Sequence, residues 1–243
     1  MDKFTKRKKH GAARKVVAMN KKNIFITSSL FLFSIIVCLI DAVVQPKYLI
    51  KISIKICFFL LLPMIFFLVN KEARSDFKQL FRFRKKGFLK ALLLGVSVFA
   101  VILGGYFLTR NVIDFSNVTK SLTEGMGITA DNFIYVFVYI AVVNSFLEEF
   151  FFRGYGFITL KKYTNRKFAY VFSSCVFAVY HVGMLLEMFH IGILFLLLLG
   201  LIVGGCIFNF LNESTNNVYP SWFVHMSANL AINTIGLILF GMI

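Results

Sequence analysis

Long apolar runs constrain this chain more than any other feature of its sequence. At about 1.5 Å of rise per residue, roughly 20 apolar residues cross the hydrocarbon core of a bilayer as a helix. Apolar residues make up 58% of the chain, whereas a soluble domain is closer to half apolar. The sequence therefore predicts an all-α polytopic membrane bundle of about seven, or eight, transmembrane helices. The candidate runs are 24–44, 49–69, 88–108, 133–153, 168–187, 190–210 and 219–241.

The basic residues indicate how these helices are oriented. Nine of the 27 Lys and Arg residues lie in residues 1–23, and eight more lie in residues 71–90. Cytoplasmic loops of membrane proteins carry an excess of Lys and Arg. We therefore expect a multi-pass cell-membrane protein whose basic tail 1–23 is cytoplasmic, together with segments 70–87 and 153–167. The net charge of +16 is interpreted as contact with the lipid bilayer and not with nucleic acid.

Two lysines fall near the start of the second apolar run. Lys51 and Lys55 lie within the first few residues of 49–69. Long basic side chains near a helix end can extend their charged groups to the membrane interface. We therefore expect both ammonium groups to lie at the interface.

The segment NSFLEEFFFRG, residues 144–154, places three charges in a run that otherwise resembles hydrocarbon. An ionisable residue within a span is costly and by default suggests function. Glu149 and Arg153 are four residues apart, so they share a helix face and can pair. Glu148 lies about 100° around the helix from Glu149 and has no such partner, although Asn144 shares its face. Glu148 is therefore a candidate general base, and a purely structural ion pair at the helix end is the alternative.

Two later runs carry further polar pairs at the same spacing. Phe177 and His181 share one face of the fifth run, and His225 and Asn229 share one face of the seventh. A histidine in an apolar helix can simply be a hydrogen-bonded packing residue, and an amide can simply bond two helices together. Taken together, the three clusters supply a carboxylate, two imidazoles and an amide. Attack of water on a peptide carbonyl requires groups of these types.

The order of the motifs EExxxR, FxxxH and HxxxN on successive membrane helices resembles the CPBP intramembrane protease family, also called Abi. This family includes type II CAAX prenyl endopeptidases and bacteriocin-processing enzymes. All three motifs are intact, and the resemblance covers roughly residues 130–240. It divides the chain into the tail 1–23, N-terminal transmembrane helices 24–129, which carry no recognised signature, and a catalytic core 130–243. It implies an endopeptidase acting on membrane-anchored peptides or proteins, such as CAAX-type, bacteriocin or pheromone precursors.

The resemblance also implies roles for individual residues. Glu148 and His181 would activate water, His225 and Asn229 would bind the oxyanion, and Glu149 belongs to the catalytic set. Arg153 and Phe177 would be supporting residues. A metalloprotease is the alternative within the family, in which Glu148, His181 and His225 hold a divalent metal, usually zinc. Two histidines and a glutamate with an open water position form a reasonable zinc site, although the motif is not HExxH.

Two other functions remain open from the sequence. One is a catalytically silent relative that serves as a membrane immunity or scaffold protein. The other is a proton-coupled transporter, because Glu and His residues in membranes also carry protons. A transporter would more often show internal repeats and broken helices, which we do not find in the sequence.

Depth along the helices gives an internal check on a shared site. Counted from the inner ends of their runs, Glu148 and His225 lie at similar depths, roughly 8 and 9 Å. His181 lies deeper, at roughly 20 Å, if its run begins at Phe168. The depths agree better if that run enters the hydrocarbon only near Ser173.

Overall fold

The computed structural model describes residues 3–85 and 87–243, with side chains described at residues 17, 19–85 and 87–243. Every regular element in these residues is a helix, which confirms the predicted all-α fold. Seven of the helices are long and apolar enough to cross a membrane. The chain is therefore a multi-pass membrane protein, in agreement with the apolar runs of its sequence.

The seven spans are built from α-helical segments, several of which continue directly into π-helical ones. In chain order they are α1 (Lys3–Leu39) with η1 (Ile40–Val44); α2 (Tyr48–Lys55), η2 (Ile56–Leu61) and α3 (Leu62–Val69); α5 (Phe88–Thr109); α7 (Ala130–Val138), η4 (Tyr139–Asn144), α8 (Ser145–Glu148), η5 (Glu149–Thr159) and η6 (Leu160–Lys162); α9 (Arg166–Tyr180) with α10 (Val182–Leu185); α11 (Ile191–Thr215); and α12 (Tyr219–Leu239). The shorter α4 (Lys71–Leu80), α6 (Ser116–Lys120) and η3 (Ser121–Gly125) lie between spans.

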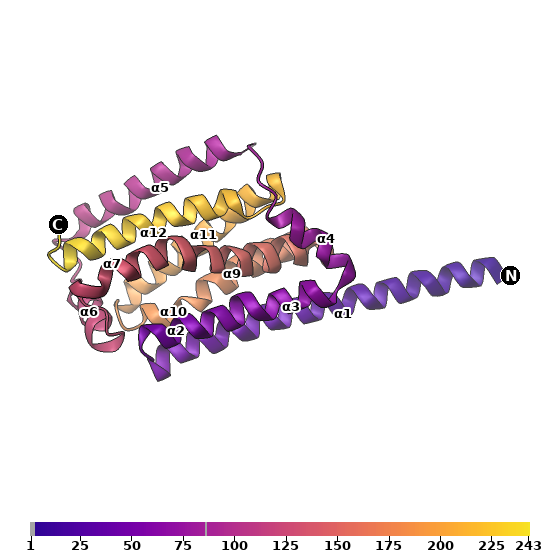
Figure 1. Cartoon of the computed structure of the whole chain (residues 1–243), viewed down its shortest axis with the longest axis horizontal. Helices are drawn as coiled ribbons and strands as arrows, with labels where there is room; N and C mark the ends of the chain where they lie inside the picture. The colour runs from indigo at the N-terminus through magenta and orange to yellow at the C-terminus, as the bar shows by residue number, and fades with distance from the viewer. Residues whose placement is uncertain (1–2, 86) are drawn as a thin grey trace.

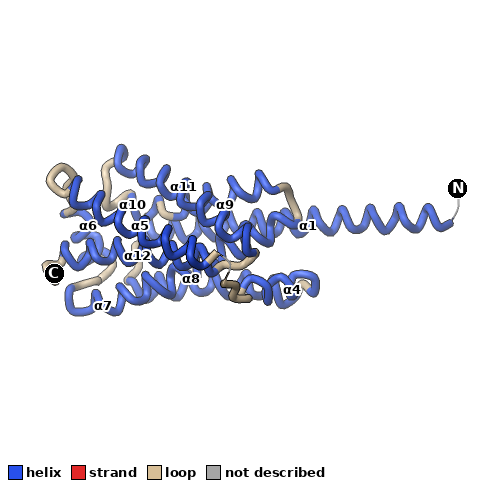
Figure 2. The backbone as a smooth tube through the Cα atoms, turned by 90° about the horizontal axis from the view of Figure 1, so that it is seen from above, coloured by secondary structure: helices blue, strands red, loops and turns tan. Residues whose placement is uncertain are grey.

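The spans lie side by side, with the two ends of the chain at opposite ends of the bundle, as an odd number of spans requires (Figure 1). Helix α5 packs along α12 on one side, α11 packs on α9, and α1 to α3 lie on the other side. The N-terminal part of α1 extends beyond the bundle, and α4 lies near the same end (Figure 2). The fourth span, α7 to η6, runs through the middle and carries the two glutamates.

The fourth span is longer than the sequence predicted. It runs from Ala130 to Lys162, whereas the apolar run ended at residue 153. The interpretation of 153–167 as a basic loop was therefore wrong, because most of it is helix whose side chains are buried against other helices. Counted from Lys162, Glu148 is roughly 21 Å along its helix, and His181 is roughly 22 Å from Arg166 in the next span. The depths of Glu148 and His181 agree, so a late entry of the fifth span near Ser173 is not needed. His225 stays roughly 9 Å from the start of its own span at Tyr219, so its agreement in depth with Glu148, expected from the sequence, does not hold when the spans are counted from these ends.

A phenylalanine-rich core joins the first two spans to the fourth and fifth. The ring of Phe59 on η2 stacks on Phe151 with centroids 4.3 Å apart, and it meets Phe152 and Tyr180 edge-on at 5.4 and 5.2 Å. Aromatic pairs in such geometries contribute beyond their buried area. These contacts fix how α2 and η2 sit against the helices that carry Glu148 and His181.

Candidate active site

Glu148 is the last residue of α8, between the π-helical segments η4 and η5, and its side chain is only 2% exposed. Its two oxygen atoms differ sharply. Oε1 accepts hydrogen bonds from Asn144 Nδ2 at 2.7 Å and from the Tyr180 hydroxyl at 2.9 Å. Oε2 is buried and accepts no hydrogen bond from the described residues. The sequence-based view that Glu148 lacks a local partner was therefore wrong for one oxygen, and the other oxygen remains available as a base.

Each of the two histidines, His181 and His225, turns its Nε2 atom toward Oε2 of Glu148. His181 Nδ1 lies 2.7 Å from the carbonyl oxygen of Phe177, and His225 Nδ1 lies 2.9 Å from Glu149 Oε1. An acceptor at Nδ1 fixes the proton on that nitrogen, so Nε2 is the atom that each ring turns toward the site. The Nε2 atoms lie 3.8 Å (His181) and 3.7 Å (His225) from Glu148 Oε2. These separations exceed a direct hydrogen bond and suit a bridging water molecule.

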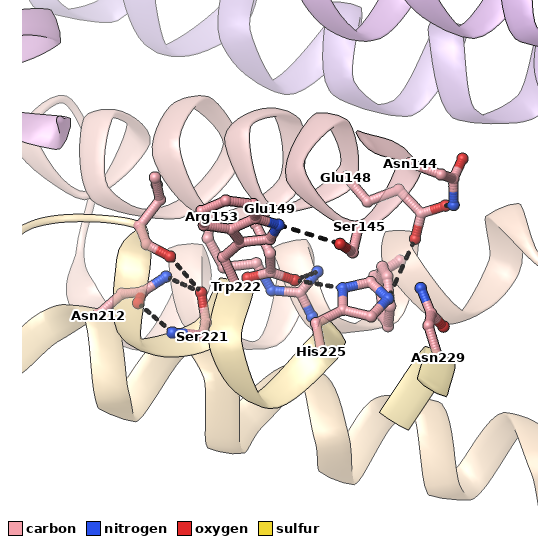
Figure 3. A network of polar contacts seen from close by, with 12 residues as sticks. Asn144, Ser145, Glu148, Glu149, Arg153, Asn212, Ser221, Trp222, His225 and Asn229 are labelled. Atoms are coloured by element: carbon pink, nitrogen blue, oxygen red, sulfur yellow. Dashed lines mark hydrogen bonds and ion pairs between the residues drawn. The ribbon is translucent and has the colours of Figure 1, made fainter. Parts of the chain in front are cut away.

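Glu149 and Arg153 form the predicted pair, with Arg153 Nη1 3.3 Å from Glu149 Oε1. Both side chains are almost fully buried, and the terminal nitrogens of Arg153 make no hydrogen bond among the described residues. Instead, the guanidinium carbon lies 4.0 Å from the ring centroid of Phe177 and 4.9 Å from that of Phe208. A desolvated cation over aromatic faces is stabilised by about 2 kcal/mol or more. Figure 3 shows Glu149 between Arg153 and His225, so this pair also orients an imidazole.

Phe177 and Asn229 complete the predicted set. The ring of Phe177 meets the rings of His181 and His225 edge-on, with centroids 4.8 and 5.9 Å away. Asn229 lies beside His225 on α12 (Figure 3), and its Nδ2 donates to the carbonyl oxygen of Ile140 at 3.0 Å. One amide hydrogen of Asn229 is thereby used in joining α12 to η4, and the amide group has a second hydrogen. The structure therefore brings all seven predicted residues together from three spans.

Two residues at the site were missed by the sequence analysis. The Tyr180 hydroxyl bonds Glu148, and Lys55 Nζ lies 3.7 Å from Glu148 Oε1 and 3.0 Å from Asn144 Oδ1. The expectation that Lys55 extends to the membrane interface is therefore wrong. Lys51 is buried as well, and its Nζ lies 3.0 Å from Asp41 Oδ1. The only sequence signal for Tyr180 is its position directly before His181. Lys55 comes from a different span and had no sequence signal beyond being a charge in an apolar run.

The same three side chains, Glu148, His181 and His225, are the predicted alternative metal ligands. Among the described residues, no group of three or more His, Cys, Asp or Glu side chains could hold a metal ion. Glu148, His181 and His225 meet around one carboxylate oxygen without forming such a group.

Comparison with known proteins supports the interpretation of this site. Residues 130–231 match the family model described as type II CAAX prenyl endopeptidase Rce1-like, which is a protease family. The matched region includes all seven predicted site residues. No curated protein and no solved structure gives a significant match. The match to this family model over residues 130–231 is consistent with the CPBP resemblance of the three motifs.

Proposed function

We propose that this protein is an intramembrane endopeptidase that hydrolyses membrane-anchored peptides or proteins with water activated by Glu148. The observation that carries the proposal is the free, buried oxygen Oε2 of Glu148, faced by the Nε2 atoms of two histidines from separate helices. The family match supports peptide hydrolysis as the type of reaction.

In the proposed first step, Glu148 Oε2 takes a proton from water while His181 Nε2 accepts the other hydrogen of that water. The water oxygen attacks the peptide carbonyl carbon, and negative charge develops on the carbonyl oxygen. Hydrogen-bond donors placed at such an oxygen lower the barrier. In this proposal the carbonyl oxygen is bound by His225, whose Nδ1 is held by Glu149, and by the second amide hydrogen of Asn229.

In the second step the peptide C–N bond breaks, and protonated Glu148 returns its proton to the leaving amine. The products are a new carboxyl terminus and a free amine, and Glu148 is again ionised. One carboxylate thus serves as base and then as acid, as general acid–base catalysis allows. Candidate substrates are CAAX-type tails and bacteriocin or pheromone precursors, presented at the cytoplasmic side of the membrane.

The test uses purified protein in liposomes and a library of membrane-anchored peptides. We expect Glu148→Ala and His225→Ala to lower cleavage by about 10²- to 10⁴-fold, the usual contribution of a general acid or base. Glu124→Ala and His190→Ala serve as matched controls, because both side chains are exposed away from the site. Wild-type cleavage that neither active-site substitution affects would contradict the proposed site.

Adding a chelator to the same assay tests the metal alternative. The side-chain mechanism predicts that wild-type cleavage is unchanged by the chelator. Loss of activity that zinc restores would instead require a metal on Glu148, His181 and His225. Absence of cleavage across the whole library would favour a silent immunity or scaffold protein.

A further inference from the structure

Lys55 lies on α2, outside the region that matches the protease family, yet it is part of the site around Glu148. Its ammonium group lies 3.0 Å from Asn144 Oδ1, 3.7 Å from Glu148 Oε1 and 5.1 Å from the centroid of the Tyr180 ring. The Lys55 side chain is only 16% exposed. A lysine that merely reached the interface would have none of these contacts.

Asn144 connects the lysine to the carboxylate. Its Oδ1 accepts from Lys55, and its Nδ2 donates to Glu148 Oε1 at 2.7 Å. An ammonium group only donates and an ionised carboxylate only accepts, so these two partners fix the orientation of the amide between them. The chain Lys55–Asn144–Glu148 therefore fits an ionised Glu148 and disfavours its protonation at Oε1.

The buried charges around the site also balance only if Lys55 is counted. Glu148 and Glu149 are adjacent carboxylates with side chains at most 2% exposed, and Arg153 pairs with Glu149. An unpaired buried charge is strongly destabilising. Lys51 is held by Asp41, so among the lysines and arginines that the structure describes Lys55 is the one paired with Glu148. The position of Lys55 is set by the packing of Phe59, one turn further along, against Phe151 and Tyr180.

We propose that Lys55 is a positioning residue of the active site, which keeps Glu148 ionised and anchored through Oε1 so that Oε2 is free to act as the base. The proposal rests on the proposed function for its effect on catalysis. The groups that face Glu148 from the surrounding elements are Lys55 on α2, Asn144 on η4, Tyr180 and His181 at the end of α9, and His225 on α12. Among these, Lys55 is the permanently cationic one.

The kinetic test measures kcat and KM against pH for wild type, Lys55→Met and Lys55→Arg on a peptide that the wild type cleaves. Losing a cation about 4 Å from a carboxylate favours its protonated form by about 1 to 3 pH units. We therefore expect the acid limb of the kcat profile to move up by at least about 1 unit in Lys55→Met, with KM changed less than about threefold. At a pH below the shifted limb, this lowers kcat by about tenfold or more. Lys55→Arg, which keeps the charge, should restore the acid limb.

The double variant Asp41→Asn/Lys51→Met is the matched control. It removes the other buried lysine of the same helix face together with its partner, without touching Glu148. The proposal expects its pH profile to match that of the wild type. An unshifted acid limb in Lys55→Met, or an equal shift in this control, would overturn the proposal.

A stability measurement tests the same contact without activity. The unfolding midpoints of wild type, Lys55→Met, Glu148→Gln and the combined variant Lys55→Met/Glu148→Gln form a double-mutant cycle. We expect Lys55→Met to lower the midpoint markedly in wild type and much less when Glu148 is neutral. Additive effects would overturn the Lys55–Glu148 coupling even if no peptide is cleaved. Coupling with no cleavage would instead count against the proposed function alone.

Discussion

At the scale of single residues, the site depends on Glu149 and Arg153 as much as on Glu148. Glu149 accepts from His225 Nδ1 while it pairs with Arg153, so its carboxylate fixes an imidazole through a buried charge. Arg153 is balanced by that carboxylate and by the ring faces of Phe177 and Phe208. Arg153 and His225 therefore meet the same oxygen of Glu149, Oε1, whereas the oxygen of Glu148 that faces the two histidines, Oε2, accepts no hydrogen bond from the described residues.

Substitution of Arg153 tests this account. Arg153→Met leaves Glu149 as an uncompensated buried charge, which costs about 3 to 5 kcal/mol. We expect a clear fall in the unfolding midpoint in detergent, measured by a thermal shift assay. The additional change Glu149→Gln should recover part of that fall.

Arg166→Met is the control for this experiment. Arg166 also pairs with a glutamate, Glu213, but its side chain is 61% exposed. Exposed ion pairs contribute little to stability. An unchanged midpoint is expected here, and a fall as large as that of Arg153→Met would contradict the assigned role of burial.

At the scale of helical elements, the number of spans could be predicted from the sequence, whereas the end of the fourth span could not. Hydropathy measures length and apolar content, and residues beyond Arg153 include glycines and lysines that resemble a loop. In the structure this stretch is helix buried by protein, with Arg153 covered by phenylalanine rings. The three motifs could be placed on one site because each is local. The contribution of Lys55 could not, because it depends on packing between helices about 90 residues apart.

Helix α10, which follows His181, packs closely against α1 at Gly183. A Cβ atom at Gly183, two residues after His181, would lie 2.1 Å from the carbonyl oxygen of Cys38 on α1. That atom belongs to the backbone and cannot turn aside. We expect Gly183→Ala to push α10 away from α1, to displace His181 and to reduce cleavage at least about tenfold, in keeping with the sensitivity of catalysis to misplacement of about 1 Å.

Gly200→Ala is the control, because a Cβ atom there meets nothing within 4 Å. Gly200 lies inside α11, where alanine favours the helix by about 1 kcal/mol. Activity should stay at the wild-type level. Equal losses in the two variants would show that the contact with α1 is not the cause.

At the scale of the whole molecule, seven spans put the basic N-terminal tail and the segment around α4 at the same end of the bundle. Segment 109–132, which carries two basic and three acidic residues, lies at the other end. The positive-inside rule therefore predicts a cytoplasmic N-terminus. The candidate active site lies between these ends, within the fourth, fifth and seventh spans.

Cysteine labelling tests this orientation in a background without the four native cysteines. We expect Ser116→Cys, at the start of α6, to react with a membrane-impermeant thiol reagent in intact cells. Lys85→Cys, on the basic side, should react only after the membrane is made permeable. The reverse pattern would place the basic residues outside.

The most direct test of the whole account compares wild type and Glu148→Gln in water enriched in oxygen-18, with the products analysed by mass spectrometry. The account predicts that the wild type adds one labelled oxygen to the new carboxyl terminus of the cleaved peptide. Glu148→Gln should remain folded, with cleavage reduced by about 10²-fold or more. Cleavage by Glu148→Gln at the wild-type rate would contradict the central claim that Glu148 activates water.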